Sequence, residues 1–344
     1  MKIVQLLDAF LIAALVAYLI TPFVKILAIK LNYLDHPKDN KVHAHPTPLL
    51  GGVVIFIAFL ISVTTKIQTI SITTIEAILL GSVILLVIGL IDDRMGMMPK
   101  IKLLGQFLAA MVVIKAGLRM SFIDNYYLSV IVTYIWIIGI TNSFNLLDNM
   151  NGLSAGIAAI AAFFFGVIMY INGQAALAAI SFALAGSAAG FLKYNFPKAE
   201  IFMGDTGSLI LGFVLSCLAI LSNWNSSFFT NRTFIPILVL GYPIFDTSLV
   251  TVMRLLERRS IFDGGKDHSS HRLALLGLKR FGAVLVIYAI CILLGMAALV
   301  ISEVKFMPAL IICILSFFAM SVLGIRLSFV DSKRFGRKKT LNGK

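Results

Sequence analysis

Two adjacent aspartates, Asp92 and Asp93, directly follow a long apolar run in the stretch GLIDDRMGMMPK, residues 89–100. Neighbouring carboxylates repel each other unless a cation lies close to both of them. That cation could be Mg²⁺, which prefers hard oxygen ligands, or the ammonium of a lysine such as Lys102. Taken alone, the pair is equally typical of a helix end that is simply solvated.

A second polar group lies in TNSFNLLDNMNGLSAG, residues 141–156. Its members recur every three residues, a spacing that places them near one face of a helix: Asn142, Asn145, Asp148 and Asn151. Amides in an apolar helix can merely bond to a neighbouring helix. Their density at the end of an apolar run favours a ligand site.

The third stretch is IFMGDTGSLILGF, residues 201–213, in which glycines flank Asp205 and Thr206. A turn that opens a helix offers backbone N–H groups to phosphate, and Asp205 adds a carboxylate that could hold Mg²⁺ against it. Asp205 or Thr206 could also be the N-cap of this helix, and both interpretations can hold together.

The fourth stretch, RSIFDGGKDHSSHRLALLGLKR over residues 259–280, is rich in hydrogen-bond donors. His268, His271 and Arg272, together with Lys266, could bind phosphate or sugar hydroxyls. The spacing of the two histidines also occurs in zinc sites, but no HExxH motif and no neighbouring cysteine accompany them. Zinc is therefore the weaker hypothesis.

The elements that must position these groups are strongly apolar. Of the 344 residues, 59% are hydrophobic and only 13% are charged, whereas soluble domains have about 25% charged residues. The composition predicts an all-α, polytopic integral membrane protein with a single domain over residues 1–344. The net charge of +13 does not indicate a nucleic-acid partner, because cytoplasmic loops of membrane proteins are enriched in Lys and Arg.

Apolar runs of spanning length predict about eleven transmembrane helices. Their approximate ranges are 5–27, 49–65, 74–91, 101–117, 127–146, 154–171, 175–192, 207–222, 234–252, 281–302 and 307–326. Most of the Lys and Arg residues follow the odd-numbered helices, so these loops should be cytoplasmic, with the N-terminus outside and the C-terminus inside. The four polar stretches then share the cytoplasmic edge. They predict a pocket for a phosphate-bearing substrate, and the bilayer suggests that one phosphate belongs to a lipid.

In sequence order the chain resembles the polyprenyl-phosphate N-acetylhexosamine-1-phosphate transferase family. The matching motifs are KVHAHPTPLLGG (41–52), LIDDRMG (90–96), NSFNLLDNMNGLSAG, FMGDTGSL, PIFDTSLVTVMR (243–254) and DHSSHRL. The resemblance implies transfer of HexNAc-1-phosphate, with GlcNAc favoured, from UDP-HexNAc to undecaprenyl phosphate, releasing UMP. It further implies a multi-pass protein of the cell inner or plasma membrane whose site faces the cytoplasm, surrounded by membrane lipid. A homodimer is left open.

The resemblance also assigns residues to roles. The expected catalytic residues are Asp92, Asp93, Asp148 and Asp205. Asn145 and Asp205 are expected to hold Mg²⁺, for which Mn²⁺ could substitute. The expected substrate-binding residues are Lys41, Lys102, Asn142, Asn151, Phe202, His268, His271 and Arg272.

Some positions depart from the family pattern. Many bacterial members carry Gly where Asn149 stands and Asp where Asn151 stands. The sequence HSSHR replaces the consecutive histidines typical of the phospho-MurNAc-pentapeptide transferase, which favours a simple HexNAc donor. That transferase remains the alternative within the family, and a secondary transporter is the alternative outside it. Transporters hold their carboxylates near the membrane midplane, commonly in repeated halves, and neither feature is apparent here.

Overall fold

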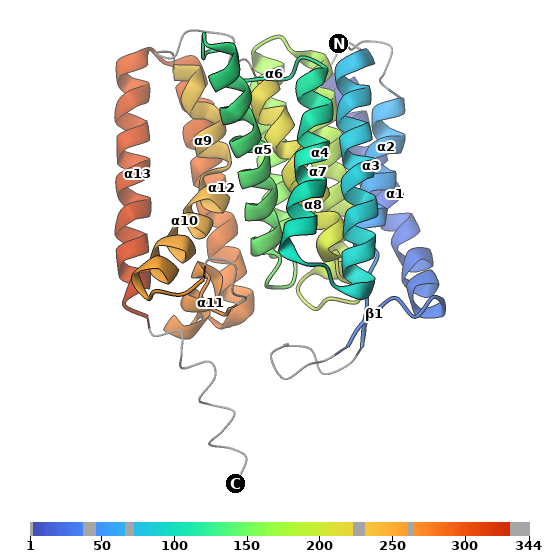
Figure 1. Ribbon diagram of the computed structural model, residues 1–344. Coiled ribbons are helices and arrows are strands. Elements are labelled where there is room, and N and C mark those ends of the chain that lie inside the picture. Colours follow the sequence, from blue (N-terminus) through green and yellow to red (C-terminus); the bar gives the residue numbers. More distant parts are fainter. Residues whose placement is uncertain (1–2, 37–45, 66–71, 223–230, 261–264, 331–344) are drawn as a thin grey trace.

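The computed structural model describes residues 3–36, 46–65, 72–222, 231–260 and 265–330 (Figure 1). Long helices run side by side between two ends of a bundle, and α1 begins at the upper end while α13 ends at the lower end. The first part contains α1 (Ile3–Lys30), β1 (Leu34–Asp35), β2 (Thr47–Pro48), α2 (Gly51–Thr64), α3 (Ile72–Met95), α4 (Pro99–Lys115) and α5 (Tyr126–Leu147). The central part contains α6 (Leu153–Ile171), α7 (Ala175–Asn195) and α8 (Gly204–Leu221). The last part contains η2 (Asn231–Phe234), α9 (Ile235–Val239), α10 (Gly241–Leu256), α11 (Ser269–Leu273), η3 (Ala274–Leu278), α12 (Lys279–Glu303) and α13 (Phe306–Ser328).

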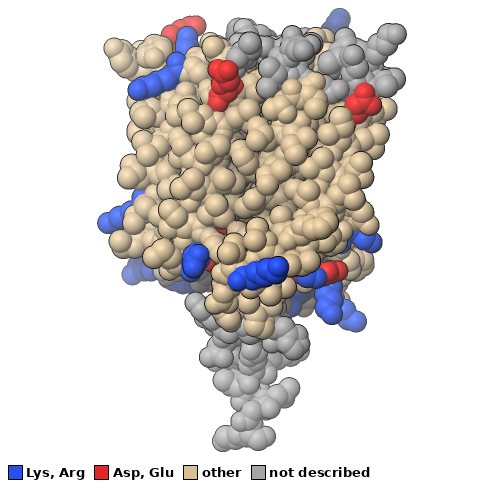
Figure 2. All heavy atoms as spheres, turned by 90° about the vertical axis from the view of Figure 1, so that its right-hand side faces the viewer, with Lys and Arg blue, Asp and Glu red and all other residues tan. Residues whose placement is uncertain are grey.

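The predicted all-helical membrane fold is confirmed. In the described residues, eight helices are long and apolar enough to cross a membrane. Figure 2 shows a broad, largely uncharged band between two rims of charged side chains, with Lys and Arg gathered along the lower rim of that face. The chain is thus a multi-pass membrane protein, while the count of eleven spans and the direction of insertion stay predictions.

Two of the expected spans differ from the predicted pattern. The helix α2 has 14 residues, below the usual spanning length of about 17 to 25 residues, whereas α4 has 17 residues, at the lower limit of that length. The expected span over 234–252 is broken at Leu240 into α9 and α10. Pro243 lacks the backbone N–H that would bond to the carbonyl of Val239, so one of the hydrogen bonds that would join the two helices is missing. Pro236 lies in the first turn of α9, where proline is well tolerated. Figure 1 shows α10 inclined at the lower end of the bundle, beside α11.

The centre of the bundle is α8, in which every residue from Thr206 to Ile220 is buried. Helices α2 and α3 approach the start of α8 closely at two glycines. A Cβ atom at Gly52 would collide with the backbone of Gly207, and one at Gly89 would collide with Thr206. Because only glycine permits this approach, three helices meet at the turn that carries Asp205.

The chain reverses between α3 and α4 through Gly96, whose φ is +71°, and Pro99 at the start of α4. A glycine with positive φ commonly ends a helix, and proline is favoured in the first turn of the next one. The short connection places Asp92 at the end of α3 beside Lys102 in the first turn of α4.

Candidate active site

A cavity of about 520 Å³ is lined by residues from the end of α3, the starts of α4 and α8 and the loop after α5, segments that lie at the lower end of the bundle (Figure 1). Its lining comes from segments far apart in the sequence, and more than half of the lining residues are polar or charged. They are Asp35, Leu49, Asp92, Asp93, Lys102, Asp148, Asn149, Met150, Asn151, Asn195, Phe202, Gly204, Asp205, Lys266 and His271. Both the size of the cavity and its convergent polar groups are typical of a small-molecule site.

On one side of the cavity, Asp93 of α3 caps the start of α8. Its Oδ1 accepts a hydrogen bond from the Asp205 N–H at 2.7 Å, and its Oδ2 accepts from the Thr206 N–H at 3.2 Å and the Thr206 hydroxyl at 2.7 Å. The expectation that Asp205 or Thr206 caps its own helix is therefore corrected, because the capping carboxylate comes from α3. Both oxygens of Asp93 are thereby engaged by α8.

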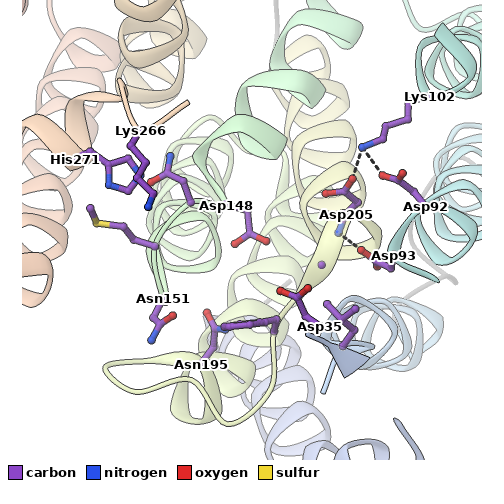
Figure 3. A pocket seen from close by; sticks show the side chains of 15 residues that line it. Asp35, Asp92, Asp93, Lys102, Asp148, Asn151, Asn195, Asp205, Lys266 and His271 are labelled. Carbon is purple, nitrogen blue, oxygen red and sulfur yellow. Dashed lines mark hydrogen bonds and ion pairs between the residues drawn. The ribbon is translucent and has the colours of Figure 1, made fainter. Parts of the chain in front are cut away.

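Asp92 and Asp205 converge on one cationic group. The ammonium of Lys102 contacts Oδ2 of both carboxylates, as Figure 3 shows. The Asn145 amide donates to Oδ1 of Asp205 at 2.8 Å and to the Ser208 hydroxyl at 3.0 Å. Four helices, α3, α4, α5 and α8, thus each contribute a polar side chain to this cluster.

The donor set of this cluster fits Mg²⁺. Among the residues that the structure describes, no three His, Cys, Asp or Glu side chains are grouped to hold a metal. Sites for Mg²⁺ at phosphate substrates, however, use only one or two carboxylates and take the remaining ligands from phosphate and water. Two carboxylates already converge on a positive charge here, and the Asn145 carboxamide oxygen is a further hard donor.

Asp148 stands between this cluster and the opposite wall of the cavity (Figure 3). It follows directly on α5. Burial raises the pKa of the Asp148 carboxyl to about 8, and the charges of Asp205 and Asp93 add to the rise. Near neutral pH this carboxyl therefore carries a proton.

Two loops of the cavity are joined by Asn195, at the end of α7. Its Oδ1 accepts from the Gly152 N–H at 2.8 Å, and its amide donates to the Ile201 carbonyl at 2.9 Å. The next residue, Phe202, is fixed by backbone bonds to Pro48 and Gly51 at 2.8 and 3.0 Å. These contacts place Phe202 in the lining of the cavity.

The remaining wall comes from the segment that contains α11. Arg254 donates to both carboxylate oxygens of Asp267 at 2.9 Å. Burial of Asp267 opposes its charge, but this hydrogen-bonded guanidinium holds the pKa of the carboxyl below its usual range. Lys266 and His271 reach the cavity from this segment, opposite Asp205 (Figure 3).

The structure brings most of the expected residues together. Those that line the cavity are Asp92, Asp93, Lys102, Asp148, Asn151, Phe202, Asp205 and His271, with Asn145 bonded to Asp205. His268 is instead buried with its Nδ1 2.8 Å from Asp246. Arg272 donates to the carbonyl oxygens of Asp267, Leu327, Ser328 and Val330, so it joins α11 to the end of α13. Lys41 lies outside the described residues.

Asn142 lies away from the cavity for a geometric reason. Three residues turn a helix by about 300°, so each step of the three-residue pattern rotates the side chain by about 60°. Because Asn142 lies two such steps before Asp148, its side chain faces α4 instead of the cavity. There the side-chain amides of Asn142 and Gln106 exchange hydrogen bonds of 2.6 and 3.2 Å. Asn142 therefore joins α4 to α5, as amides in apolar helices can do by bonding to a neighbouring helix.

Lys266, named with the histidine stretch as a phosphate donor, lines the cavity, whereas three other polar lining residues were not assigned from the sequence. Asn149 lies inside a stretch already singled out, so its neighbourhood was a usable signal. Asn195 ends an apolar helix on the same side as the other polar groups, which is a weaker signal. Asp35 pairs within a two-residue β-ladder that the hydrophobic pattern did not predict.

Comparison with known proteins gives the same result as the motifs. Residues 75–223 match glycosyl transferase family 4. The chain is 34% identical over 341 residues to a probable undecaprenyl-phosphate N-acetylglucosaminyl 1-phosphate transferase of Bacillus subtilis, covering 96% of this chain and 95% of that protein. It is 31% identical over 312 residues to a decaprenyl-phosphate N-acetylglucosaminephosphotransferase of Mycobacterium leprae, with coverages of 80% and 78%. A phospho-N-acetylmuramoyl-pentapeptide-transferase of Bacillus cytotoxicus is 33% identical over 239 residues, with coverages of 62% and 72%. The chain belongs to glycosyl transferase family 4, and the resemblance drawn from its motifs is confirmed.

Proposed function

We propose that the protein transfers N-acetylhexosamine-1-phosphate, with GlcNAc as the sugar, from UDP-HexNAc to undecaprenyl phosphate and releases UMP. The observation that carries this proposal is the meeting of Asp92, Lys102 and Asp205 in a polar cavity at one end of an apolar bundle. A lipid phosphate whose tail lies in the bilayer can meet a water-soluble diphosphate there. The names of the Bacillus subtilis and Mycobacterium leprae relatives support a polyprenyl phosphate acceptor and a GlcNAc group. The product would begin a cell-envelope glycan.

The charge distribution supports a cytoplasmic site. On the face drawn in Figure 2, most of the Lys and Arg side chains lie along the lower rim, at the end of the bundle where α3 ends and α8 begins, and such residues mark the cytoplasmic side of membrane proteins. Nucleotide sugars are cytoplasmic substrates, so this direction of insertion would bring the donor to the cavity.

Residues of the cluster also suit a magnesium-dependent reaction. Asp92, Asp205 and Asn145 would hold Mg²⁺, for which Mn²⁺ could substitute. When bound, such an ion neutralises charge on a diphosphate. The Lys102 ammonium adds a phosphate donor of its own beside the two carboxylates.

The attacking group needs little activation by the protein. The second pKa of a phosphate monoester is about 6, so near pH 7 most of the acceptor is already a dianion. We therefore favour direct in-line displacement of UMP by the lipid phosphate. One phosphoanhydride bond breaks and one forms, so the reaction is near balance and reversible.

The geometry of the aspartates supports this route over a covalent aspartyl-phosphate. Both oxygens of Asp93 accept hydrogen bonds from α8, and Asp92 accepts one from the Met97 N–H at 2.6 Å while contacting Lys102. Neither carboxylate is presented as a free nucleophile. Asp148, which is protonated near neutral pH, can donate a hydrogen bond to a phosphate oxygen.

The choice of donor can be tested directly. Purified protein is incubated with Mg²⁺, undecaprenyl phosphate and, in separate reactions, UDP-GlcNAc, UDP-GalNAc or UDP-MurNAc-pentapeptide, and released UMP is measured. We expect release with UDP-GlcNAc. Release with the MurNAc donor alone would support the pentapeptide transferase, and no release with any donor would favour the transporter. A phosphorylated protein trapped with UDP-sugar in the absence of lipid would overturn direct displacement.

A further inference from the structure

The short helix α11 carries His271 into the cavity, but it has only five residues. It is followed by a π-helical turn in which Gly277 has a φ of +100°. A single helical turn has no independent stability in water, so its position has to come from bonds to neighbouring elements.

Asp246 of α10 holds the first turn of α11. This carboxylate is fully buried and accepts hydrogen bonds from the Ser269 N–H at 2.7 Å and from the Ser269 hydroxyl. The His268 ring nitrogen Nδ1 lies 2.8 Å from its other oxygen, and the Tyr242 hydroxyl lies 2.6 Å from Ser269 Oγ. Unpaired buried carboxylates are costly, so this set of donors keeps α11 fixed on α10.

Asn149, in the loop between α5 and α6, holds the same helix through a different serine. The Ser270 hydroxyl donates to Oδ1 of Asn149 at 2.7 Å, and Ser270 is fully buried. The amide group of Asn149 donates to the Leu146 carbonyl at 2.8 Å, which fixes its orientation. The loop between α5 and α6, which carries Asp148 and Asn151, is thereby joined to the residue that precedes His271.

We propose that Asp246 and Asn149 are positioning residues that hold α11 from two sides and thereby set the place of His271 in the cavity. The inference rests on the proposed function, in which His271 contacts the donor nucleotide sugar. On this view His268 acts as a link between α10 and α11. The fit of the donor then depends on the hydrogen bonds that these two residues make to α11.

A double-mutant cycle tests the proposal. Ser270→Ala and Asp246→Asn are made alone and together with His271→Ala, and kcat and KM are measured with UDP-GlcNAc. Loss of a buried hydrogen bond of this kind should raise KM for the donor about tenfold, with a smaller change in kcat. In the His271→Ala protein, neither change should raise KM further. Equal effects with and without His271 would overturn the proposal.

Matched variants separate positioning from general destabilisation. Ser270→Thr keeps the hydroxyl and should restore the KM of the natural chain. Ser187→Ala removes another buried serine hydroxyl, one that donates within α7 to Leu184 at 2.8 Å, and should leave KM unchanged. If Asp246→Asn fails to fold, Ser270→Ala decides the question alone.

A second measurement needs no turnover. Diethyl pyrocarbonate modification of His271 is followed by mass spectrometry, and we expect it to be several-fold faster in Ser270→Ala than in the natural chain, because His271 is buried when α11 is held. Equal rates would contradict positioning. If the natural chain released no UMP from any donor, the proposed function would fail, while this rate would still decide whether Ser270 positions His271.

Discussion

The carboxylate of Asp93 accepts a hydrogen bond from the backbone N–H of Asp205 at 2.7 Å, which joins the end of α3 to the start of α8. A bond of the Asp93 carboxylate to Thr206 extends this cap, and glycines on α2 and α3 allow the three helices to meet there. The two adjacent aspartates therefore differ in environment. Asp93 organises the turn, whereas Asp92 faces the lysine and the second carboxylate.

The first prediction concerns this division between the aspartates. Asp93→Ala removes the acceptor for the start of α8, so it should lower the free energy of unfolding by about 1–2 kcal/mol, as for other lost helix caps. Asp92→Asn should reduce turnover strongly with a much smaller effect on stability. Thermal melting and UMP release of the two variants, side by side, check this. Equal melting temperatures for both variants would contradict the capping role.

The second prediction concerns Lys102, whose ammonium occupies the position between two carboxylates that a cation would take. In Lys102→Met, Mg²⁺ no longer competes with that ammonium, and the two carboxylates repel each other until it binds. Mg²⁺ should therefore raise the melting temperature at about tenfold lower concentration than in the natural chain, a shift that corresponds to ~1.4 kcal/mol. UMP release should fall. An unchanged or weaker response to Mg²⁺ would argue against a shared cation position.

The third prediction concerns the pH dependence of stability. The folded protein holds a proton on Asp148 up to about pH 8, whereas an aspartate in an unfolded chain releases it near pH 4. Between these values the folded state binds more protons, so the contribution of Asp148 to stability falls as pH rises, by up to about 1.4 kcal/mol per pH unit. Asp148→Asn removes this dependence.

The melting temperature of Asp148→Asn minus that of the natural chain should therefore increase from pH 5 to pH 8. The variant should also release UMP more slowly than the natural chain. Asp124→Asn is a suitable control, because Asp124 is exposed in the loop between α4 and α5. A gain that is the same at every pH would show that Asp148 is ionised in the folded protein.

The fourth prediction separates Arg272 from His271. The Arg272 guanidinium donates to carbonyl oxygens at the end of α13, so Arg272→Gln should lower the melting temperature and affect all donors alike. His271→Ala should keep the melting temperature and raise KM for UDP-GlcNAc. A variant Arg272→Gln with normal stability and a raised KM would restore the expectation that Arg272 binds substrate.

Much of this site could be predicted from the sequence, because polar side chains at the ends of apolar runs have few other places to lie. That reasoning found Asp92, Asp148 and Asp205 on one face of the membrane. It could not predict that Asp93 would cap a helix more than 100 residues away in the sequence. Whether the Asp93 carboxylate reaches the start of α8 depends on how α3 and α8 pack.

Two of the departures from the family pattern gained meaning only in three dimensions. Asn149 and the serines of HSSHR were noted separately, and the structure joins Asn149 to Ser270 at 2.7 Å. The three-residue spacing alone also placed Asn142 on the same helix face as Asp148, which the structure does not show. Side chains three residues apart do not stay on one face, because an α-helix has 3.6 residues per turn. The broken helix at Leu240 is consistent with Pro243, whose missing N–H removes a bond between α9 and α10 and which hydropathy does not detect.

The most direct test of the central claim is the dependence of UMP release on both the lipid acceptor and the carboxylate cluster. Purified protein with UDP-GlcNAc and Mg²⁺ should release UMP only when undecaprenyl phosphate is present, in a one-to-one ratio with lipid-linked GlcNAc. Asp92→Asn and Asp205→Asn should each lower the rate by about a hundredfold or more while remaining folded. UMP release that is independent of the lipid, or unchanged in both variants, would contradict the account.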